Sequence, residues 1–208
     1  MPNPRLLTSP YCTIGPFFPG TFVTGCEDMT SFRGIAARGQ QILLKGRVFE
    51  EGARPIQNAV LEIWQPDANG IFRHPADPRF AEADPGFFGW GRVRTDANGE
   101  YCFRTILPGA SFSGQPGLNN SGLMQKRCPH LNLMLLAIGL TRRLVTTVFF
   151  VETIDGILDP VLASVPNPEM RGRMLARREQ TASDAEACPV YRYDIVTRGE
   201  NESPFFVD

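Results

Sequence analysis

From residue 42 onward the chain carries short segments in which apolar and polar residues alternate. Alternation with a period of two places side chains on opposite faces of a β-strand, so each segment predicts a strand with a buried face. The predicted strands are residues 42–50 (ILLKGRVFE), 59–65 (AVLEIWQ), 100–106 (EYCFRTI), 130–140 (HLNLMLLAIGL), 143–152 (RLVTTVFFVE) and 190–198 (VYRYDIVTR). Many short strands with little helix predict a mainly β protein, a β-sandwich of mixed sheets with extended loops.

Residues 1–40 follow no sustained period and are rich in Pro, Gly, Thr and Ser. They predict a long N-terminal arm with loops, ahead of a β-sandwich domain at residues 41–208. Residues 167–179 (NPEMRGRMLARRE) predict a short helix with a solvated basic surface. The tetrapeptide DANG occurs at residues 67–70 and 96–99, and because Asn and Gly tolerate positive φ, both copies predict hairpin turns. A calcium loop is disfavoured, because the Gly has the wrong offset and no Glu closes a twelve-residue loop.

Composition argues against several classes of function. Among 208 residues, 21 Lys+Arg stand against 22 Asp+Glu, and this near-neutral balance is not typical of a nucleic-acid binder. The N-terminus lacks the apolar run of a secretory signal. The longest apolar stretch, residues 131–140, is too short to span a membrane. The five cysteines form no C-x-x-C pair, and their odd number disfavours a disulfide framework. These features predict a cytoplasmic protein.

Residues that could act in catalysis or bind a metal are few in this sequence. The chain has two histidines, His74 and His130, and it contains no G-x-S-x-G, Walker, G-x-G-x-x-G or H-E-x-x-H motif. His74 lies in a polar, Pro-rich loop and is interpreted as a local hydrogen-bonding residue, whereas His130 begins a strand and is interpreted first as a satisfied interior histidine. Paired carboxylates for glycoside cleavage would have to come from Glu62, Asp67 or Asp84. The spacing of these residues in the sequence does not identify any two of them as a catalytic pair. Residue types and motifs by themselves therefore indicate only a β-sandwich.

Longer blocks of sequence are more specific. They are residues 8–20 (TSPYCTIGPFFPG), 45–72 (KGRVFEEGARPIQNAVLEIWQPDANGIF), 88–109 (FGWGRVRTDANGEYCFRTILPG), 128–140 (CPHLNLMLLAIGL) and 203–208 (SPFFVD). In this order they resemble segments of the intradiol ring-cleaving dioxygenases. The fourth block is similar to the A-P-H-[IL]-N-[ILV] segment of the α subunits of protocatechuate-cleaving members. The resemblance runs from about residue 8 to the end of the chain.

The resemblance implies a reaction that inserts O2 between two adjacent hydroxyl-bearing ring carbons of a catecholate held on ferric iron. Iron-binding members supply two tyrosinates and two imidazoles, a hard, anionic set that keeps the iron ferric. The matching positions here are Phe72, Ser111, His130 and Asn132, so one neutral ligand of the four remains. The resemblance therefore implies a non-catalytic α-type subunit without a metal of its own. Fe(III) would be held by a catalytic β subunit in an αβ hetero-oligomer.

The resemblance also implies that the arm closes the pocket over the partner's iron, with Thr13, Gly15 and Pro16 along its wall. Gly15 would let the backbone approach the aromatic substrate closely, and Pro16 would stiffen the wall. Ile138 stands where α subunits usually carry an Arg that approaches the ring carboxylate of protocatechuate. We therefore expect weaker recognition of that carboxylate, or a substrate with another para substituent such as a sulfonate.

Several alternatives stay open at this point. Arg142 or Arg143 could compensate for the missing Arg, although both fall in an expected turn. Arg127 matches an Arg that lies beside the iron-bound ring in catalytic chains, which leaves room for a chain that is active by itself. The chain could also be a metal-free binding or structural module, or a homomeric enzyme with another cofactor. Three large side chains could belong to the core or to an interface: Phe87, Phe88 and Trp90.

Overall fold

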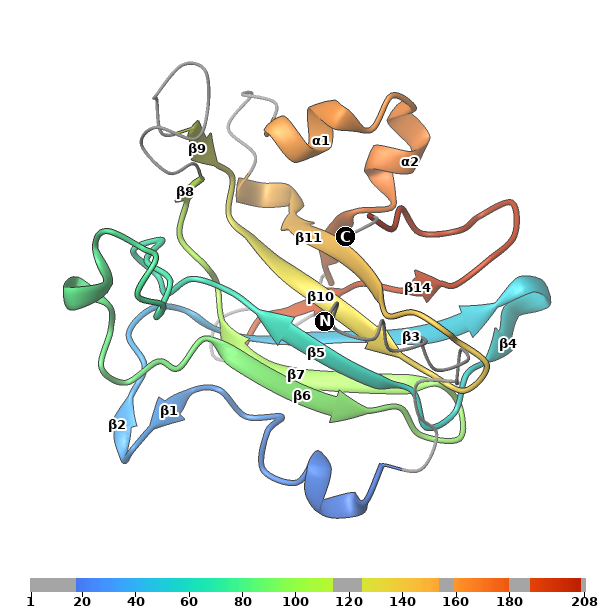
Figure 1. The fold of residues 1–208 in the computed structure, drawn as a ribbon, viewed down its shortest axis with the longest axis horizontal. Coiled ribbons are helices and arrows are strands. Elements are labelled where there is room, and N and C mark those ends of the chain that lie inside the picture. The colour runs from blue at the N-terminus through green and yellow to red at the C-terminus, as the bar shows by residue number, and fades with distance from the viewer. Residues whose placement is uncertain (1–17, 114–124, 154–158, 180–187, 207–208) are drawn as a thin grey trace, which may run out of the picture.

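The computed structural model describes residues 18–113, 125–153, 159–179 and 188–206. Strands dominate these residues, and one large mixed sheet runs through the molecule (Figure 1). Its ten strands are β3 (Gln41–Glu50), β4 (Arg54–Pro55), β5 (Val60–Trp64), β6 (Trp90–Arg94), β7 (Glu100–Ile106), β10 (His130–Leu136), β11 (Leu144–Phe150), β12 (Leu175–Arg178), β13 (Val190–Arg192) and β14 (Ile195–Val196). Two smaller pairs are β1 (Ser31–Phe32) with β2 (Ile35–Ala36), and β8 (Ser111–Ser113) with β9 (Gln125–Arg127).

Helices are few and short. The α-helices α1 (Pro160–Ser164) and α2 (Pro168–Gly172) have five residues each. The described part of the chain also contains four 3-10 turns: η1 (Gly20–Phe22), η2 (Glu51–Ala53), η3 (Phe80–Glu82) and η4 (Val151–Thr153). Within the described residues, no helix has the length and apolar character needed to cross a membrane. The prediction of a mainly β fold with little helix is confirmed.

The sheet curls, so that its two halves face each other across a common core. Its strand order is β14-β3-β13-β12-β11-β10-β5-β6, and β7 and β4 also pair with β3. The pairs β11–β12, β13–β3 and β14–β3 are parallel and the other pairs are antiparallel. Side chains from β3 and β7 meet those from β5 and β10 in one apolar cluster that includes Ile42, Leu44, Leu61, Ile63, Phe103, Leu131 and Leu133. This arrangement is the predicted sandwich of mixed sheets.

Strand β10 shows how alternation positions the residues of interest. Leu131, Leu133 and Leu135 are fully buried in the core. His130 and Asn132 alternate with them and therefore point to the opposite face of the sheet. A second apolar cluster covers that face at the His130 end, with members Phe149, Leu162, Val165 and Met174.

The predicted helix at residues 167–179 is wrong for its second half. Only Pro168–Gly172 is helical, and Leu175–Arg178 forms β12. This strand pairs in parallel with β11 and antiparallel with β13. Pairing on both sides outweighs the helix propensity of an Arg-rich segment, which is a weak preference by comparison.

Both DANG segments form turns, with Gly70 and Gly99 at φ of 75° and 73°. The prediction that they close hairpins is wrong. Residues 67–70 lie inside the long connection between β5 and β6. Residues 96–99 join β6 to β7, but β6 pairs with β5 and β7 pairs with β3. The second turn thus connects the two halves of the sandwich.

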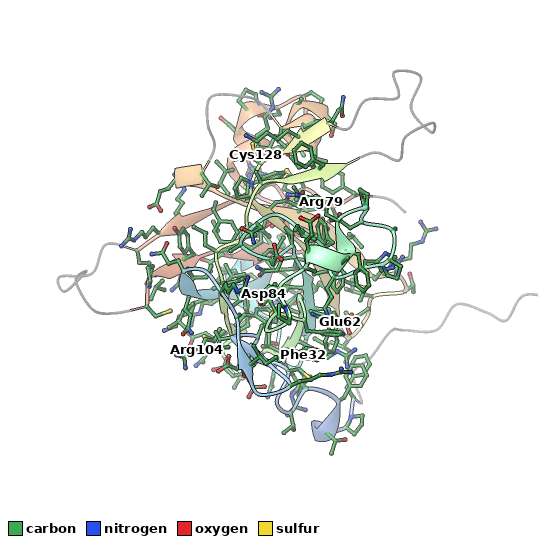
Figure 2. All side chains as sticks on the ribbon, turned by 90° about the vertical axis from the view of Figure 1, so that its left-hand side faces the viewer. Phe32, Glu62, Arg79, Asp84, Arg104 and Cys128 are labelled. Carbon is green, nitrogen blue, oxygen red and sulfur yellow. The ribbon has the colours of Figure 1, made fainter. Side chains whose placement is uncertain are left out.

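The structure separates the three large side chains that the sequence left open. Phe87 is 2% exposed and belongs to the core, whereas Phe88 is 43% exposed. The Phe88 ring stacks on Phe32 with the ring centroids 5.0 Å apart. Trp90 is half-buried beside Arg92. Figure 2 shows Phe32 near the first strands, and Cys128 at the opposite end of the molecule beside the helices.

Candidate functional site around His130

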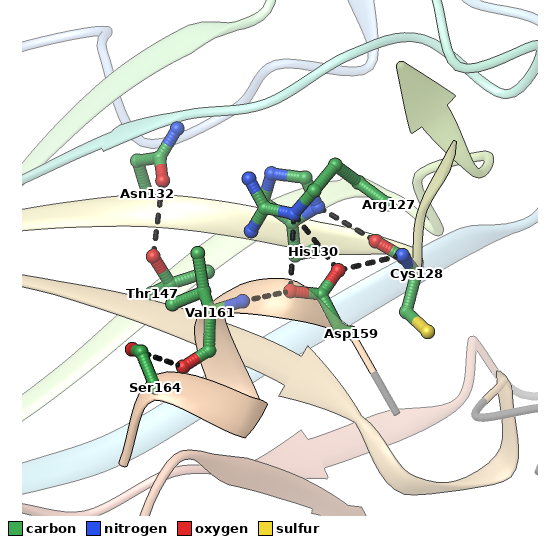
Figure 3. Close-up of polar contacts among 8 residues, drawn as sticks. All are labelled: Arg127, Cys128, His130, Asn132, Thr147, Asp159, Val161 and Ser164. Carbon is green, nitrogen blue, oxygen red and sulfur yellow. Dashed lines mark hydrogen bonds and ion pairs between the residues drawn. The ribbon is translucent and has the colours of Figure 1, made fainter. Parts of the chain in front are cut away.

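His130 is the centre of the cluster in Figure 3. It opens β10 and is only 2% exposed. Its Nδ1 lies 2.6 Å from the carbonyl oxygen of Cys128. Because a carbonyl only accepts, Nδ1 carries the proton and Nε2 of the neutral ring bears the lone pair. An imidazole held in this way by a backbone carbonyl is oriented as metal-binding histidines commonly are.

The surroundings of His130 favour its neutral form. Burial lowers the pKa of the imidazole from its ordinary value of 6.5 to about 4, and the positive charge of Arg127 acts in the same direction. The bond to the Cys128 carbonyl and the negative charge of Asp159 oppose this shift without cancelling it. His130 is therefore uncharged at neutral pH.

A buried ion pair lies beside the ring. Arg127 Nε donates to both carboxylate oxygens of Asp159, at 3.0 and 2.8 Å. Asp159 also accepts from the backbone N–H of Cys128 at 2.9 Å and from that of Val161 at 2.8 Å, which caps α1. Its side chain is 0% exposed. The sequence reasoning did not select Asp159, although an Asp-Pro pair ahead of a helix is a known capping signal.

The other three ligand positions come together around His130. The Phe72 ring lies between His130, with centroids 6.4 Å apart, and Trp64, with centroids 6.0 Å apart. Asn132 is paired across the sheet with Trp64 on β5 and accepts from Thr147 Oγ1 on β11 at 3.2 Å. Ser111 is buried on β8, directly opposite Arg127 on β9.

Close backbone packing holds two of these positions next to each other. A Cβ on Gly70 would collide with the backbone of Ala110, so only glycine lets the Phe72 loop lie against the segment that leads to Ser111. The Phe72 N–H also donates to Asp77 Oδ2 at 2.9 Å. The local sequence thus fixes the loop geometry independently of any metal.

This donor set does not fit ferric iron. Phe72 offers no oxygen, the Asn132 amide oxygen is engaged by Thr147, and the nearest carboxylate, Asp159, is neutralised by Arg127. His130 supplies a single neutral nitrogen, where Fe(III) requires several hard, anionic ligands. Among the described residues no group of three or more His, Cys, Asp or Glu could hold a metal ion.

The remaining predicted site residues divide into two groups. Thr13, Gly15 and Pro16 lie outside the described residues. Ile138 lies in the turn between β10 and β11 and is 63% exposed. Two basic residues of the same connection, Arg142 and Arg143, are also exposed. The structure thus presents Ile138 at the surface.

The other candidate residues have structural roles. His74 accepts from the backbone N–H of Ala76 at 3.1 Å, which confirms it as a loop hydrogen-bonding residue. Asp67 accepts from the backbone N–H groups of Ile71 and Asp84, the latter bond reaching Oδ2 at 2.9 Å. Asp84 in turn accepts from the backbone N–H of Gly86. Glu62 forms an ion pair with Arg92. These contacts do not leave a free pair of carboxylates.

A family model described as "Dioxygenase" matches residues 15–199 of the chain. The beta chain of protocatechuate 3,4-dioxygenase from Burkholderia cepacia is 34% identical over 166 residues, covering 80% of this chain and 68% of that one. The chain belongs to the intradiol ring-cleaving dioxygenase family. The resemblance stated from the sequence blocks is thereby confirmed.

Other members of this family match along different lengths. The protocatechuate 3,4-dioxygenase alpha chain of Burkholderia cepacia is 29% identical over 211 residues, covering 97% of this chain and 98% of that one. The alpha chain from Pseudomonas putida is 29% identical over 172 residues, covering 82% and 77%. The solved 3-chlorocatechol 1,2-dioxygenase from Rhodococcus opacus 1CP superposes with a TM-score of 0.59 at 21% identity, covering 88% of this chain and 68% of that one. This last likeness shows the fold alone.

Proposed function

We propose that the chain is the α-type subunit of a heteromeric intradiol dioxygenase of the protocatechuate type, and that it does not hold the iron. The observation that carries the proposal is the occupation of the four ligand positions. His130 keeps a lone pair on Nε2 that could bind a metal, but the Phe72 ring lies beside it and offers no ligand atom. The side-chain oxygen of Asn132 already accepts a hydrogen bond from Thr147 on the neighbouring strand. Fe(III) would be bound by a catalytic β subunit, where it would make a catecholate reactive toward O2.

The extent of the matches supports the α assignment. The chain aligns with 98% of an alpha chain but with 68% of a beta chain, even though its identity to the beta chain is higher. A subunit that shares the fold and most of the length of an alpha chain is suited to pairing with a beta chain. In this arrangement O2 adds to a substituted catechol, the bond between the two hydroxyl-bearing carbons breaks, and a cis,cis-muconate forms.

The contribution of this chain would be part of the pocket wall. Thr13, Gly15 and Pro16 would close the partner's site, and Ile138 would face the ring substituent. Ile138 is 63% exposed in the turn between β10 and β11, so its side chain is accessible to a partner chain. An apolar residue here favours weaker binding of a ring carboxylate, or a different para substituent.

The test compares the chain produced by itself, the β-type chain encoded near it, and the two produced together. Each sample is assayed for iron per chain, for the visible charge-transfer band of tyrosinate bound to Fe(III), and for O2 uptake with protocatechuate. We expect a colourless chain, and a coloured, O2-consuming complex when the partner is present. Stoichiometric iron in the isolated chain would overturn the proposal. A partner that is fully active without this chain, and does not bind it, would instead indicate a separate binding or structural module.

A further inference from the structure

A cavity of about 670 Å³ lies against the outer face of β13, β3 and β7. Residues 23–27 and the end of β6 with the turn after it complete its lining. Its floor points away from the core on one half of the sandwich, whereas His130 and Asn132 point away from the core on the other half. The volume is within the range of about 300–1,000 Å³ that small organic ligands occupy. The cavity is therefore separate from the site on which the proposed function rests.

The floor of the cavity adjoins a row of cations on paired strands. Lys45 on β3 is opposite Arg192 on β13, and Arg192 is opposite Arg177 on β12. Each of the three alternates with a residue of the core, so all three point outward; the core residues are Leu44, Tyr191 and Ala176. Like charges at this spacing repel each other and destabilise the sheet. An anion bound over the row would offset part of this repulsion.

The fold compensates little of this positive charge. The side chains of Lys45 and Arg177 have no hydrogen bond or ion pair within the part of the chain that the structure describes. Arg192 lies 3.5 Å from a carboxylate oxygen of Glu179 and from one of Asp194. All three of these side chains are more than 40% exposed, and exposed ion pairs of this kind are weak. The row therefore keeps most of its charge.

Lys45 is the member of the row that lies deepest in the cavity wall. It lines the cavity together with Cys102, its partner in register on β7. Burial raises the pKa of the Cys102 thiol, and the positive charge of Lys45 opposes that rise, so the two side chains lie close together. Lys45 is half-buried, and water screens its charge less than that of an exposed lysine. An anionic group on the floor of the cavity would therefore be attracted strongly to Lys45.

Carboxylates also line the cavity, but their own contacts reduce their effect on a bound anion. Glu100 forms an ion pair with Arg47 at 3.1 Å. Asp96 accepts from the backbone N–H groups of Asn98 and Glu100, both at 2.8 Å. Glu27 is exposed, so solvent screens its charge. The negative groups are thus either paired, satisfied by the backbone or screened.

The unpaired charge in the cavity is positive on balance. Among the described residues that line it, Lys45 and Arg94 are cations without a side-chain partner, and Glu27 is the corresponding carboxylate. We propose that this cavity binds a small organic anion with two or more carboxylate or phosphate groups, held mainly by Lys45 and Arg192. The volume exceeds what a bare inorganic ion needs, and neighbouring cations favour a ligand with more than one negative charge.

The experiment uses the full chain, in which Lys45 and Lys126 are the two lysines. With an isotope label at the lysine Cε, the NMR spectrum has two side-chain signals, and Lys126→Met identifies which belongs to Lys45. The chain is titrated with citrate and, separately, with pyrophosphate, at an ionic strength held constant with NaCl. Calorimetry gives Kd for the native chain, Lys45→Met, Lys45→Arg and Lys126→Met. Lys126 is the matched control, because it is exposed on β9.

We expect the Lys45 signal to shift and saturate with at least one probe, while the Lys126 signal stays in place. Lys45→Met should weaken binding about tenfold or more, as for the loss of a charge-assisted contact. Lys45→Arg should retain binding, because arginine also binds carboxylates and phosphates, and Lys126→Met should leave Kd unchanged. A response to citrate alone assigns the ligand to the carboxylates, and a response to pyrophosphate alone assigns it to the phosphates.

The titration of the native chain decides the proposal even where Lys45→Met does not fold. If neither probe moves the Lys45 signal, the cavity does not bind this class of anion. If the signals of Lys45 and Lys126 move together without saturating, the effect is unspecific screening and the proposal is wrong. Binding that is undiminished in Lys45→Met would also overturn it, because the anion would then be held elsewhere.

Discussion

Protonation of His130 offers a direct solution test of the site. The pKa of this imidazole is lowered to about 4, first by burial and then by Arg127. The chain has only two histidines, so proton NMR of the ring Cε1–H groups gives two signals, and His74→Gln identifies which belongs to His130. We expect the His130 signal to stay at its neutral position until the pH approaches 4.

The same shift makes stability depend on pH. Between pH 6.5 and about 4 the unfolded chain binds a proton at His130 and the folded chain does not, so the free energy of unfolding falls as the pH falls. At about 1.36 kcal/mol for each pKa unit, the loss over this window is on the order of 3 kcal/mol. Urea unfolding should show it in the native chain, and His130→Gln should remove that part of the pH dependence.

Arg127→Met tests the cause. The substitution removes the cation that lowers the pKa of His130 and leaves the negative charge of Asp159 unbalanced, and both changes raise the pKa. The titration should therefore move upward toward 6.5. Arg47→Met is the control, because Arg47 is paired with Glu100 on β7. A His130 signal that titrates near 6.5 in the native chain, or that ignores Arg127→Met, would refute the geometry described for the cluster.

Substitutions at three single positions test the buried contacts and the substituent hypothesis. Asp159→Asn should destabilise the chain by about 3–5 kcal/mol, since it leaves the Arg127 charge buried without its partner, and a thermal melt should show a Tm lower by roughly 10 °C. Gly46→Ala should cost about 3 kcal/mol or more in urea unfolding, because its Cβ would overlap the carbonyl oxygen of Tyr193. In the assembled enzyme, Ile138→Arg should lower KM for protocatechuate roughly ten- to a hundredfold by a charge-assisted contact with the carboxylate.

Each of these predictions has a control and a contradicting outcome. Asp28→Asn removes an exposed carboxylate and should change stability by less than about 1 kcal/mol. Gly172→Ala adds a Cβ where nothing lies within 4 Å, so it should be tolerated. A loss below about 1 kcal/mol for Asp159→Asn or Gly46→Ala would contradict the burial described for those sites. An unchanged KM for Ile138→Arg would contradict the substituent hypothesis.

The alternation of apolar and polar residues predicted the central strands because burial alternates along these strands with the same period of two. Residues 100–106 were predicted as a strand and β7 has the same bounds, since its inward residues are buried and its outward ones are exposed. β12 was missed, because its four residues show no alternating burial and its polar members are arginines that indicate a solvated helix. The parallel pairing of β13 and β14 with β3 joins residues about 150 positions apart, and no local pattern carries that information.

Only part of the candidate site was predicted, because its other contacts also join residues that are far apart in the sequence. The resemblance placed Phe72, Ser111, His130 and Asn132 in one cluster, and the structure brings them together through β-sheet register and ring stacking. Asp159 could not be selected in this way. Asp159 matters because it pairs with Arg127, which is 32 positions away in the sequence. Such a pair can be identified only from the structure, in which β9 packs against the start of α1.

The geometry of β10 also separates the residues that build the core from the residues at the predicted ligand positions. Leu131 and Leu133 supply the core, whereas His130 and Asn132 project from the other face. A substitution at residue 132 therefore need not create a cavity in the core, and on the same face the Phe72 ring stacks against Trp64. Because core and ligands occupy opposite faces of the same strand, selection on one need not preserve the other. The inner face of β10 therefore contributes to the packing of the fold, and the outer face carries two of the four positions that we propose as replaced or orphaned iron ligands.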